Sequence, residues 1–379
     1  MKILFVAMPS IHFIRWIENL KDTDYEFFWF DILDRKELNT TLKITKITDW
    51  NKRKLPKIKG EYFLYKKFPK LYKKIQPLLE VSVNEVFSKL VDEVKPDLVH
   101  SFEMQNCSYP ILEIMQKNKH IKWLYSCWGS DLYYYQNYKH HLNKIKATLK
   151  RLNFIHTDNN RDINIAKHLG FKGVFTTVIP GGTGYDLVSL EQFKKPLKDR
   201  KIILIKGYEH TFGRAINVLK AISKIKNIEN EYQIVVFACH AKTIDYIKRN
   251  NLNYKYYTRN ELSHKELLKL FGKSKIYIGN SISDGIPNTL LEAIVMEVFP
   301  IQSNPGNVTK EIIENIINGL LINNPEDILH IKSEIEKSLV LASKQKIIKA
   351  AKMNRFIAEN RLDYKLNKEK VINLYANIF

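Results

Sequence analysis

Short apolar runs alternate with helical patterns along this chain, and no other feature limits its possible folds as strongly. In the first half the apolar runs fall at 2–7, 25–30, 97–102, 122–126, 153–157 and 174–178. Helical patterns fall between them at 11–20, 66–94, 109–117, 137–152 and 163–169. Runs that are apolar throughout indicate strands of a parallel sheet with helices on both faces.

A segment rich in glycine and proline interrupts this series, and a second series then begins. Residues 179–186 read IPGGTGYD, which indicates a turn or hinge. Further apolar runs follow at 201–206, 233–238, 255–257, 275–279 and 300–302. Helical patterns follow at 215–226, 242–250, 264–271, 287–297 and 309–315.

Two such series predict an α/β fold with two Rossmann-like domains that face a central cleft. We expect an N-terminal domain at 1–180, a hinge at 181–200, a C-terminal domain at 201–355 and a helical tail at 356–379. The tail is expected to pack back on the N-terminal domain. Ligands of open parallel sheets bind beyond the carboxyl ends of the strands, so the cleft is the expected site.

The chain is expected to be cytoplasmic. Its three cysteines, Cys107, Cys127 and Cys239, form no C-x-x-C pair or disulfide framework, which favours a reducing compartment. The first residues resemble a core strand more than a signal peptide. No stretch approaches the roughly 20 apolar residues that cross a bilayer, so any contact with the inner face of the cell membrane is expected to be peripheral.

The net charge of +21 favours an anionic partner: nucleic acid, acidic lipid or a phosphorylated small molecule. Residues 43–74 hold twelve Lys and Arg, only two carboxylates, and six interleaved aromatic residues. This mixture is typical of a surface that docks on anionic lipid headgroups. It is equally typical of a solvated basic face whose aromatic residues lie in the core. No zinc module or RNA-stacking motif appears, and we expect no nucleic-acid partner.

The stretch 277–321 carries the most chemical information. A buried strand leads to a polar turn and then to a helix with Pro287 in its first turn. Ile286 precedes the proline, so no side-chain cap is expected. The amides of Asn288, Thr289 and Leu290 are therefore predicted to be available to an anionic ligand.

Two carboxylates stand eight residues apart in this stretch. Glu292 is the only charged residue in an otherwise apolar part of the helix, and Asp284 precedes the helix on the polar turn. A buried carboxylate is costly unless a group hydrogen-bonds to it. One interpretation assigns both residues to a ligand. The other is structural: Asp284 caps the helix, and Glu292 pairs with a buried lysine or with backbone amides.

Together with the two-domain pattern, this stretch resembles the GT-B fold and, within it, family 4 of the retaining nucleotide-sugar glycosyltransferases. The family pattern is S-x-x-E-G-x-P-x-x-L-L-E-A, and residues 281–293 read SISDGIPNTLLEA. Asp284 replaces the commoner glutamate. Glu297 stands where the family usually has glycine.

The resemblance implies specific roles for residues of the second domain. Asp284 is expected to contact the donor sugar and Glu292 the ribose of the nucleotide. The helix start after Gly285, including Asn288, Thr289 and Leu290, is expected to hold the diphosphate. The family has cations after the first strand of this domain. Here these are expected to be Lys206 and Arg214, with Gly207 beside the donor; the alternative is that both are surface cations of a lysine-rich chain.

In the first domain, residues 125–131 read YSCWGSD and resemble the family's H-G-x-D segment, with tryptophan in place of histidine. The resemblance implies that Gly129, Ser130 and Asp131 lie on the acceptor or sugar side. Ser10 and His12 are predicted to line the same side. A helix N-cap is an equally good interpretation of Ser10.

The resemblance implies transfer of a sugar from a nucleotide-diphosphate sugar, with UDP or GDP as the nucleotide, to a glycan or lipid-linked acceptor. We expect retention of configuration and a role in cell-surface polysaccharide or glycoconjugate synthesis. Catalysis is expected to rest on Asp284, Lys206 and Arg214, with no cofactor. No metal is expected, because no D-x-D motif lies near the donor residues. The alternatives are a GT-B nucleotide-sugar epimerase, a phosphorylase and, more remotely, a nucleic-acid-binding protein.

Overall fold

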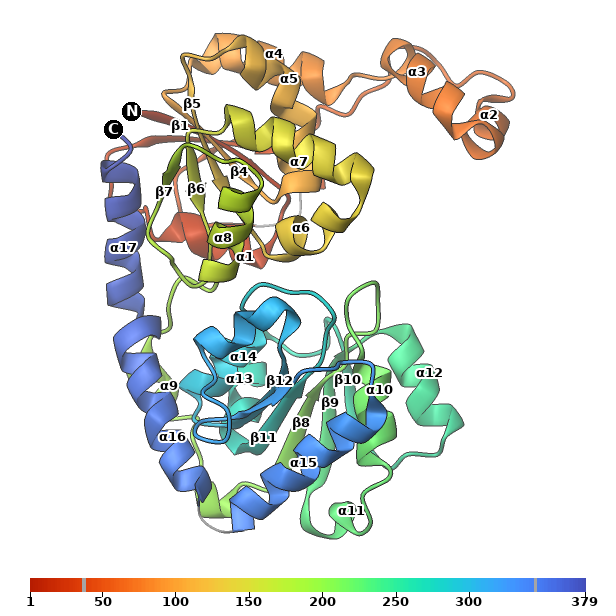
Figure 1. Cartoon of the computed structure of the whole chain (residues 1–379). Helices are drawn as coiled ribbons and strands as arrows, with labels where there is room; N and C mark the ends of the chain where they lie inside the picture. The colour runs from red at the N-terminus through yellow and green to blue at the C-terminus, as the bar shows by residue number, and fades with distance from the viewer. Residues whose placement is uncertain (36–38, 344–345) are drawn as a thin grey trace. The chain divides into compact units, whose positions relative to one another are not determined.

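The computed structural model describes residues 1–35, 39–343 and 346–379 (Figure 1). The chain divides into two compact units. The first contains Met1–His156 and Ile165–Thr177, and the second contains Thr157–Asn164 and Val178–Phe379. The second unit thus includes eight residues from the first alternating series, and also the tail at 356–379. The predicted packing of that tail on the first domain stays a prediction.

The first unit is built on one parallel sheet. Its strands are β1 (Lys2–Ala7), β2 (Glu26–Asp31), β3 (Thr45–Ile47), β4 (Leu98–Phe102), β5 (Lys122–Ser126), β6 (Phe154–His156) and β7 (Val174–Phe175). Within the described residues they lie in the order β3-β2-β1-β4-β5-β6-β7. The helices are α1 (Ile11–Glu18), α2 (Glu61–Lys67), α3 (Pro69–Leu79), α4 (Val83–Val94), α5 (Tyr109–Lys117), α6 (Ser130–Tyr133), α7 (Lys139–Arg151) and α8 (Asn160–His168). The first turn of α8 belongs to the second unit.

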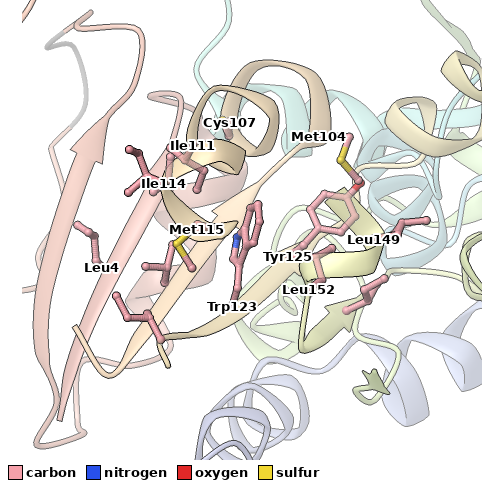
Figure 2. Packing of buried hydrophobic residues seen from close by; sticks show 14 of the residues in the cluster. Leu4, Met104, Cys107, Ile111, Ile114, Met115, Trp123, Tyr125, Leu149 and Leu152 are labelled. Atoms are coloured by element: carbon pink, nitrogen blue, oxygen red, sulfur yellow. The ribbon is translucent and has the colours of Figure 1, made fainter. Parts of the chain in front are cut away.

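The core of this sheet explains why its strands are apolar on both faces. Residues 3–7 of β1 have no exposed surface. Trp123 of β5 is also fully buried, and Figure 2 shows it pointing toward the helix that carries Ile111. Its indole N–H donates to the Ser101 hydroxyl at 2.9 Å, so the buried polar atom of the ring has a partner.

The helix predicted at 66–94 is wrong as a single element. Pro69 begins α3, and Phe68 before it has a non-helical backbone (φ −129°, ψ 58°). Residues preceding proline avoid the helical region, which separates α2 from α3. Ser82 and Glu85 then form a capping box that starts α4. In Figure 1, α2 and α3 project from the rest of the first unit.

The second unit repeats the parallel-sheet architecture. Its strands are β8 (Ile202–Lys206), β9 (Gln233–Cys239), β10 (Lys255–Thr258), β11 (Ser274–Gly279), β12 (Phe299–Ser303) and β13 (Leu320–Ile322), in the order β10-β9-β8-β11-β12-β13 among the described residues. Its helices are α9 (Leu187–Glu191), α10 (Ala215–Ile222), α11 (Ile228–Glu231), α12 (Ala241–Arg249), α13 (His264–Lys273), α14 (Asn288–Val295), α15 (Ile328–Ser343), α16 (Lys346–Ile357) and α17 (Tyr364–Ala376). Two parallel-sheet Rossmann-like units confirm the predicted fold class.

The predicted strands are all present, and most of their ends agree within one residue. The strand expected at 174–178 is shorter, and two edge strands, Thr45–Ile47 and Leu320–Ile322, were not predicted. The helix expected at 309–315 is wrong. A 3₁₀ segment, Pro305–Glu311, overlaps the start of that range, and Gly306 and Asn307 inside this segment have left-handed backbones (φ 60° and 64°). Residues 312–315 are not helical, so no α-helix spans the predicted range.

The structure accounts for the departure at Glu297. This residue follows the end of α14 with φ 56°, in the left-handed region where glycine is favoured. Its carboxylate pairs with Lys194 at 2.9 Å and with Arg355 at 2.7 Å. These two cations hold the pKa of the Glu297 carboxyl below its ordinary value against the opposing effect of burial. The ion pairs therefore offset the backbone strain that a glycine would avoid.

Candidate functional site

The donor residues predicted in the second unit lie at the carboxyl ends of its central strands. Lys206 ends β8, and Asp284 follows β11 on the loop before α14. Burial raises the pKa of Asp284, while the positive charges of Lys206 and Arg161 oppose that rise. A desolvated carboxyl close to two cations is thus assembled on this loop.

Glu292 lies on α14 with only 4% of its surface exposed. Its Oε1 faces Nε2 of His264, the first residue of α13, at 2.7 Å. Its Oε2 is also buried and has no hydrogen-bond partner. The structural interpretation named a lysine or backbone amides as the partners of Glu292; the partner of Oε1 is instead a histidine.

The start of α14 has no side-chain cap, as predicted from Ile286 and Pro287. The Leu290 amide, however, donates to the Pro287 carbonyl at 2.9 Å, so the expectation that this amide is available to a ligand is wrong. The Thr289 hydroxyl bonds to the Tyr277 hydroxyl at 2.8 Å. Asn288 begins the helix, and its carbonyl accepts a bond from the hydroxyl of Tyr185 at 3.4 Å.

The loop before α14 contacts two residues that sequence reasoning missed. Asp158 Oδ2 accepts the Ile286 amide at 3.0 Å, and Arg161 Nη2 donates to the Asp284 carbonyl at 2.8 Å. Asp158 thus satisfies the Ile286 amide just before the start of α14. Burial, together with the nearby charge of Asp162, raises the pKa of Asp158 to about 7.

A group of aromatic and cationic side chains surrounds Lys206. The Lys206 Nζ lies 4.6 Å from the ring centroid of Tyr208, and the guanidinium of Arg259 lies 5.8 Å from the same centroid. His240 stacks on Tyr208 at 4.9 Å. Burial and the surrounding positive charges lower the pKa of His210 to about 4. The strand ends β8, β9 and β10 therefore meet in a cationic group that can receive an anion.

The guanidinium of Arg214 bonds to protein groups, whereas the resemblance implied a contact with the donor. Its Nη1 donates to the carbonyls of three residues of its own loop, His210, Thr211 and Gly213. Its Nε lies 3.2 Å from a carboxylate oxygen of Glu326. The guanidinium thus stabilises the loop that follows β8 and adds positive charge beside His210.

The two glycines expected beside the donor are both required by close packing. A Cβ on Gly207 would lie 2.7 Å from the Cys239 sulfur, so this glycine lets β8 and β9 approach each other. A Cβ on Gly285 would lie 2.8 Å from Asp158 Oδ2. Gly285 thus leaves room for the Asp158 carboxylate, a contact that the sequence pattern alone did not reveal.

In the first unit, Asp131 is buried and bonded within its own fold. Its carboxylate accepts bonds from the Tyr125 hydroxyl, the Cys127 thiol and the amides of Met104 and Trp128. Four donors saturate the usual acceptor capacity of a carboxylate. The prediction that Asp131 orients sugar hydroxyls is therefore not supported; Asp131 joins the loops after β4 and β5.

The remaining first-unit candidates lie on the loops after β1 and β5. Ser10 caps α1 by accepting the Phe13 amide at 3.2 Å, which supports the N-cap interpretation. The His12 ring lies 5.9 Å from that of Trp128. Gly129 has φ 87°, a conformation that favours glycine, and Ser130 begins α6 after it.

Among the residues that the structure describes, no three His, Cys, Asp or Glu side chains gather in a way that could hold a metal ion. The metal-independent and cofactor-independent reaction stays a prediction. Over the same residues, no helix combines the length and the apolar content that crossing a membrane requires.

His264, Asp158 and Arg161 carried no sequence signal that would have identified them. His264 meets Glu292 across 28 residues, and Asp158 meets Ile286 across 128. Both contacts arise from the fold. Tyr208 and Arg259 followed predicted strands and could have been found by inspecting every strand end.

Two segments of the chain match glycosyltransferase families. Residues 189–355 match the model for Glycosyl transferases group 1, and residues 78–159 match the model for Glycosyl transferase 4-like. No curated protein sequence matches the chain.

Several solved structures are similar across the whole chain. A sucrose-phosphate synthase from Thermosynechococcus elongatus has 15% identity and a TM-score of 0.73, covering 100% of this chain and 99% of that one. Anabaena Alr3699/HepE in complex with UDP-glucose has 12% identity and a TM-score of 0.67, covering 100% of both chains. A glycosyltransferase from Rickettsia africae ESF-5 has 16% identity and a TM-score of 0.65, covering 100% and 98%. At these identities the likeness concerns the fold.

Proposed function

We propose that this chain, which is a glycosyltransferase with the GT-B fold, transfers a sugar from a nucleoside-diphosphate sugar to a glycan or lipid-linked acceptor. The transfer retains the anomeric configuration, as in family 4, which the sequence pattern at 281–293 resembles. The product belongs to cell-surface polysaccharide or glycoconjugate synthesis.

The observation that carries the proposal is the unpartnered oxygen of Glu292. A buried carboxylate oxygen without a donor costs free energy in the unliganded protein. A ribose supplies the missing donor, because its hydroxyl groups can bond to a carboxylate. His264 holds the other oxygen at 2.7 Å and so fixes the direction in which Oε2 points.

Other groups at the carboxyl ends of the strands of this sheet suit the rest of a nucleoside diphosphate. Lys206 and Arg259 carry positive charge at strand ends, and the uncapped start of α14 adds the positive end of a helix dipole. These charges stabilise the diphosphate as it accumulates negative charge on leaving the sugar. Asp284, close to Lys206, is assigned to the hydroxyl groups of the sugar.

A nucleotide-sugar epimerase of the same fold is the alternative. It would bind the same nucleotide sugar as its single substrate and convert it to an epimer, without an acceptor. The sequence context of Asp284 and Glu292 favours the transferase, because the matched family over 189–355 is one of glycosyl transferases.

A thermal-shift screen tests the donor assignment. UDP, GDP, ADP and their glucose derivatives are added in turn, and a bound ligand raises the melting temperature according to its concentration and affinity. Anabaena Alr3699/HepE, whose structures hold UDP-glucose and UDP, suggests UDP as the first probe. If no nucleoside diphosphate raises the melting temperature, the assignment of the donor site is wrong. Once an acceptor is found, the anomeric configuration of the product, read by NMR, decides retention.

The protruding helices α2 and α3 support a peripheral attachment to an anionic membrane, at the position predicted from residues 43–74. Residues 53–80, which include these helices, are called the arm. Eight large apolar side chains of the arm are about half or more exposed: Leu55, Ile58, Tyr62, Phe63, Tyr65, Phe68, Leu71 and Leu78. Exposed lysines lie among them at 57, 59, 66, 67, 70, 73 and 74. Apolar side chains that enter the interface, with cations at the headgroup level, are what an anionic bilayer binds.

The arm is an ordered element whose two carboxylates are already paired. Arg53 bonds to Glu61 through both terminal nitrogens at 2.8 Å and to Glu80 at 3.2 Å. Tyr72 is buried and donates to Glu61 at 2.9 Å. Tyr72 is therefore part of the arm's own packing and not of the docking surface. Trp50 is not part of the docking surface either, because it packs on the core of the first unit and its indole donates to the Asp31 carbonyl.

Vesicle co-sedimentation tests this attachment. We expect the protein to bind phosphatidylglycerol vesicles at low salt and to bind phosphatidylcholine vesicles much more weakly. Replacing Phe63 and Phe68 with serine should weaken binding. Leu329→Ser is the matched control, because Leu329 is 69% exposed but lies on α15 of the other unit. Equal binding by the arm variant and the wild type would refute the role of the arm.

A further inference from the structure

The segment 158–161, which includes the start of α8, is hydrogen-bonded to the loop that leads into α14. Asp158 Oδ2 accepts the Ile286 amide at 3.0 Å, and Arg161 Nη2 donates to the Asp284 carbonyl at 2.8 Å. The two bonds lie on either side of Gly285. The loop 284–286 is thus held at both ends by residues more than 120 positions away in the sequence.

The gripping segment is itself held in place. The Asn159 side-chain amide donates to Asp158 Oδ1 at 2.5 Å and to Asp162 Oδ2 at 2.8 Å. Arg161 donates through Nε to Asp162 at 2.9 Å and through Nη1 to the Pro305 carbonyl at 2.8 Å. The guanidinium therefore has a fixed position before it reaches the loop.

A second contact fixes the start of α8 to the same unit. The carboxylate of Glu311 accepts the amide of Asn160 at 2.9 Å and that of Arg161 at 3.1 Å. A carboxylate at a helix start satisfies amides that the helix leaves without partners. The direction from which Asp158 and Arg161 approach the loop is therefore set by the 3₁₀ segment that ends at Glu311.

We propose that Asp158 and Arg161 are positioning residues that hold the loop 284–286 in the shape in which Asp284 and the start of α14 receive the donor. Neither residue is assigned a contact with the donor. They act through the loop backbone: with the Asp284 carbonyl and the Ile286 amide bonded, the direction of the chain into Pro287 is fixed. This inference rests on the proposed donor site, but its structural part can be tested without any ligand.

The environment of Asp158 predicts a pH dependence. Burial and the charge of Asp162 raise the pKa of Asp158 to about 7, against the bonds from Asn159 and Ile286 and the charge of Arg161. Asp284, with Lys206 near it, lies at the other end of the held loop. A charged acceptor forms a stronger hydrogen bond than a neutral one. Because a raised pKa means protonation below about pH 7, the grip on Ile286 weakens as the pH falls from 8 to 6.

Hydrogen exchange of the unliganded protein tests the grip directly. Asp158→Ala should increase exchange of the amides in 284–291, after correction for intrinsic rates, by about 10-fold or more, because the Ile286 bond is lost. Asp158→Asn keeps a neutral acceptor oxygen and should increase exchange much less than Asp158→Ala does. Arg161→Lys loses the guanidinium group that bonds to Asp284, Pro305 and Asp162. The amides of 284–291 should exchange faster in this variant as well. Unchanged exchange in Asp158→Ala and Arg161→Lys would overturn the proposal.

Binding of UDP-glucose tests the consequence for the donor. Wild-type affinity should fall several-fold between pH 8 and pH 6, and Asp158→Asn should show a flat profile. Glu103→Gln is the matched control, since burial raises the pKa of Glu103 to about 7 as well, but this residue lies in the first unit. It should keep the wild-type profile. A wild-type profile for Asp158→Asn would refute the role of Asp158, and so would a flat profile for Glu103→Gln. Failure of the wild type to bind any nucleotide would refute the proposed function instead, and the exchange experiment would still decide the grip.

Discussion

Replacing Glu292 with glutamine isolates the chemistry of one carboxylate without changing its volume. In the structure, Oε1 of Glu292 lies 2.7 Å from His264, and Oε2 is buried without a donor. Hydrogen bonds to a charged group contribute about 1.5–3 kcal/mol each. At about 1.4 kcal/mol per tenfold, loss of the charge should weaken UDP binding by about 10- to 150-fold. The free energy of unfolding should change by only about 1 kcal/mol, because glutamine keeps an acceptor for His264.

Isothermal titration with UDP and with its 2′-deoxy and 3′-deoxy analogues provides the sharpest form of this test. The wild type should bind at least one deoxy analogue more weakly than UDP, because a ribose hydroxyl that bonds to Glu292 is missing. The glutamine variant should discriminate much less between UDP and that analogue. If the variant binds UDP as tightly as the wild type, or discriminates equally well, the assignment of Glu292 to the ribose is wrong.

Three further predictions concern stability. The pKa of Glu61 is lowered to about 2, first by its bond to Arg53. The stability that this pair gives the arm is therefore present above about pH 4.5 and is lost as the pH falls toward 2. Limited proteolysis of α2 and α3 across this range should show cleavage only in acid, and cleavage that does not vary with pH would contradict the pairing. In urea unfolding, Glu297→Gly should be less destabilising than Glu297→Ala by about 1 kcal/mol. Both variants lose the ion pairs, but only alanine keeps the backbone strain of φ 56°. Equal losses of stability would show that the backbone is not strained. Leu291→Ala removes a fully buried side chain of α14 and should cost about 2–5 kcal/mol, whereas Leu329→Ala at an exposed position should change the unfolding free energy by about 0.5 kcal/mol or less.

The strands were predictable because a strand buried on both faces must be apolar at every position. Residues 3–7 and 276–278, which have no exposed surface, illustrate this. The strand Thr45–Ile47 escaped prediction because, among the described residues, it lies at the sheet edge beside β2 and has two exposed polar residues. The breaks around Phe68 and Ser82 could have been predicted, since Pro69 and a Ser-x-x-Glu sequence mark helix starts.

The candidate site was only partly predictable, for a different physical reason. Asp284 and Glu292 stand close in sequence, so a local pattern identified them. Asp158 and His264 matter through what they contact, and those partners are brought near by the fold. For Asp131 the residue type suggested a ligand, but its four internal donors come from loops whose proximity no local pattern shows.

The second unit is not one continuous stretch of chain, and this has a consequence for dividing the protein. A fragment that begins at Val178 contains every strand of the second sheet but lacks Thr157–Asn164. Glu311 would then lose the amides of Asn160 and Arg161, and the Ile286 amide would lose its acceptor. We expect such a fragment to fold with a disordered entry into α14. Adding the peptide 157–164 in trans, or joining it to the fragment by a linker, should restore order to that turn.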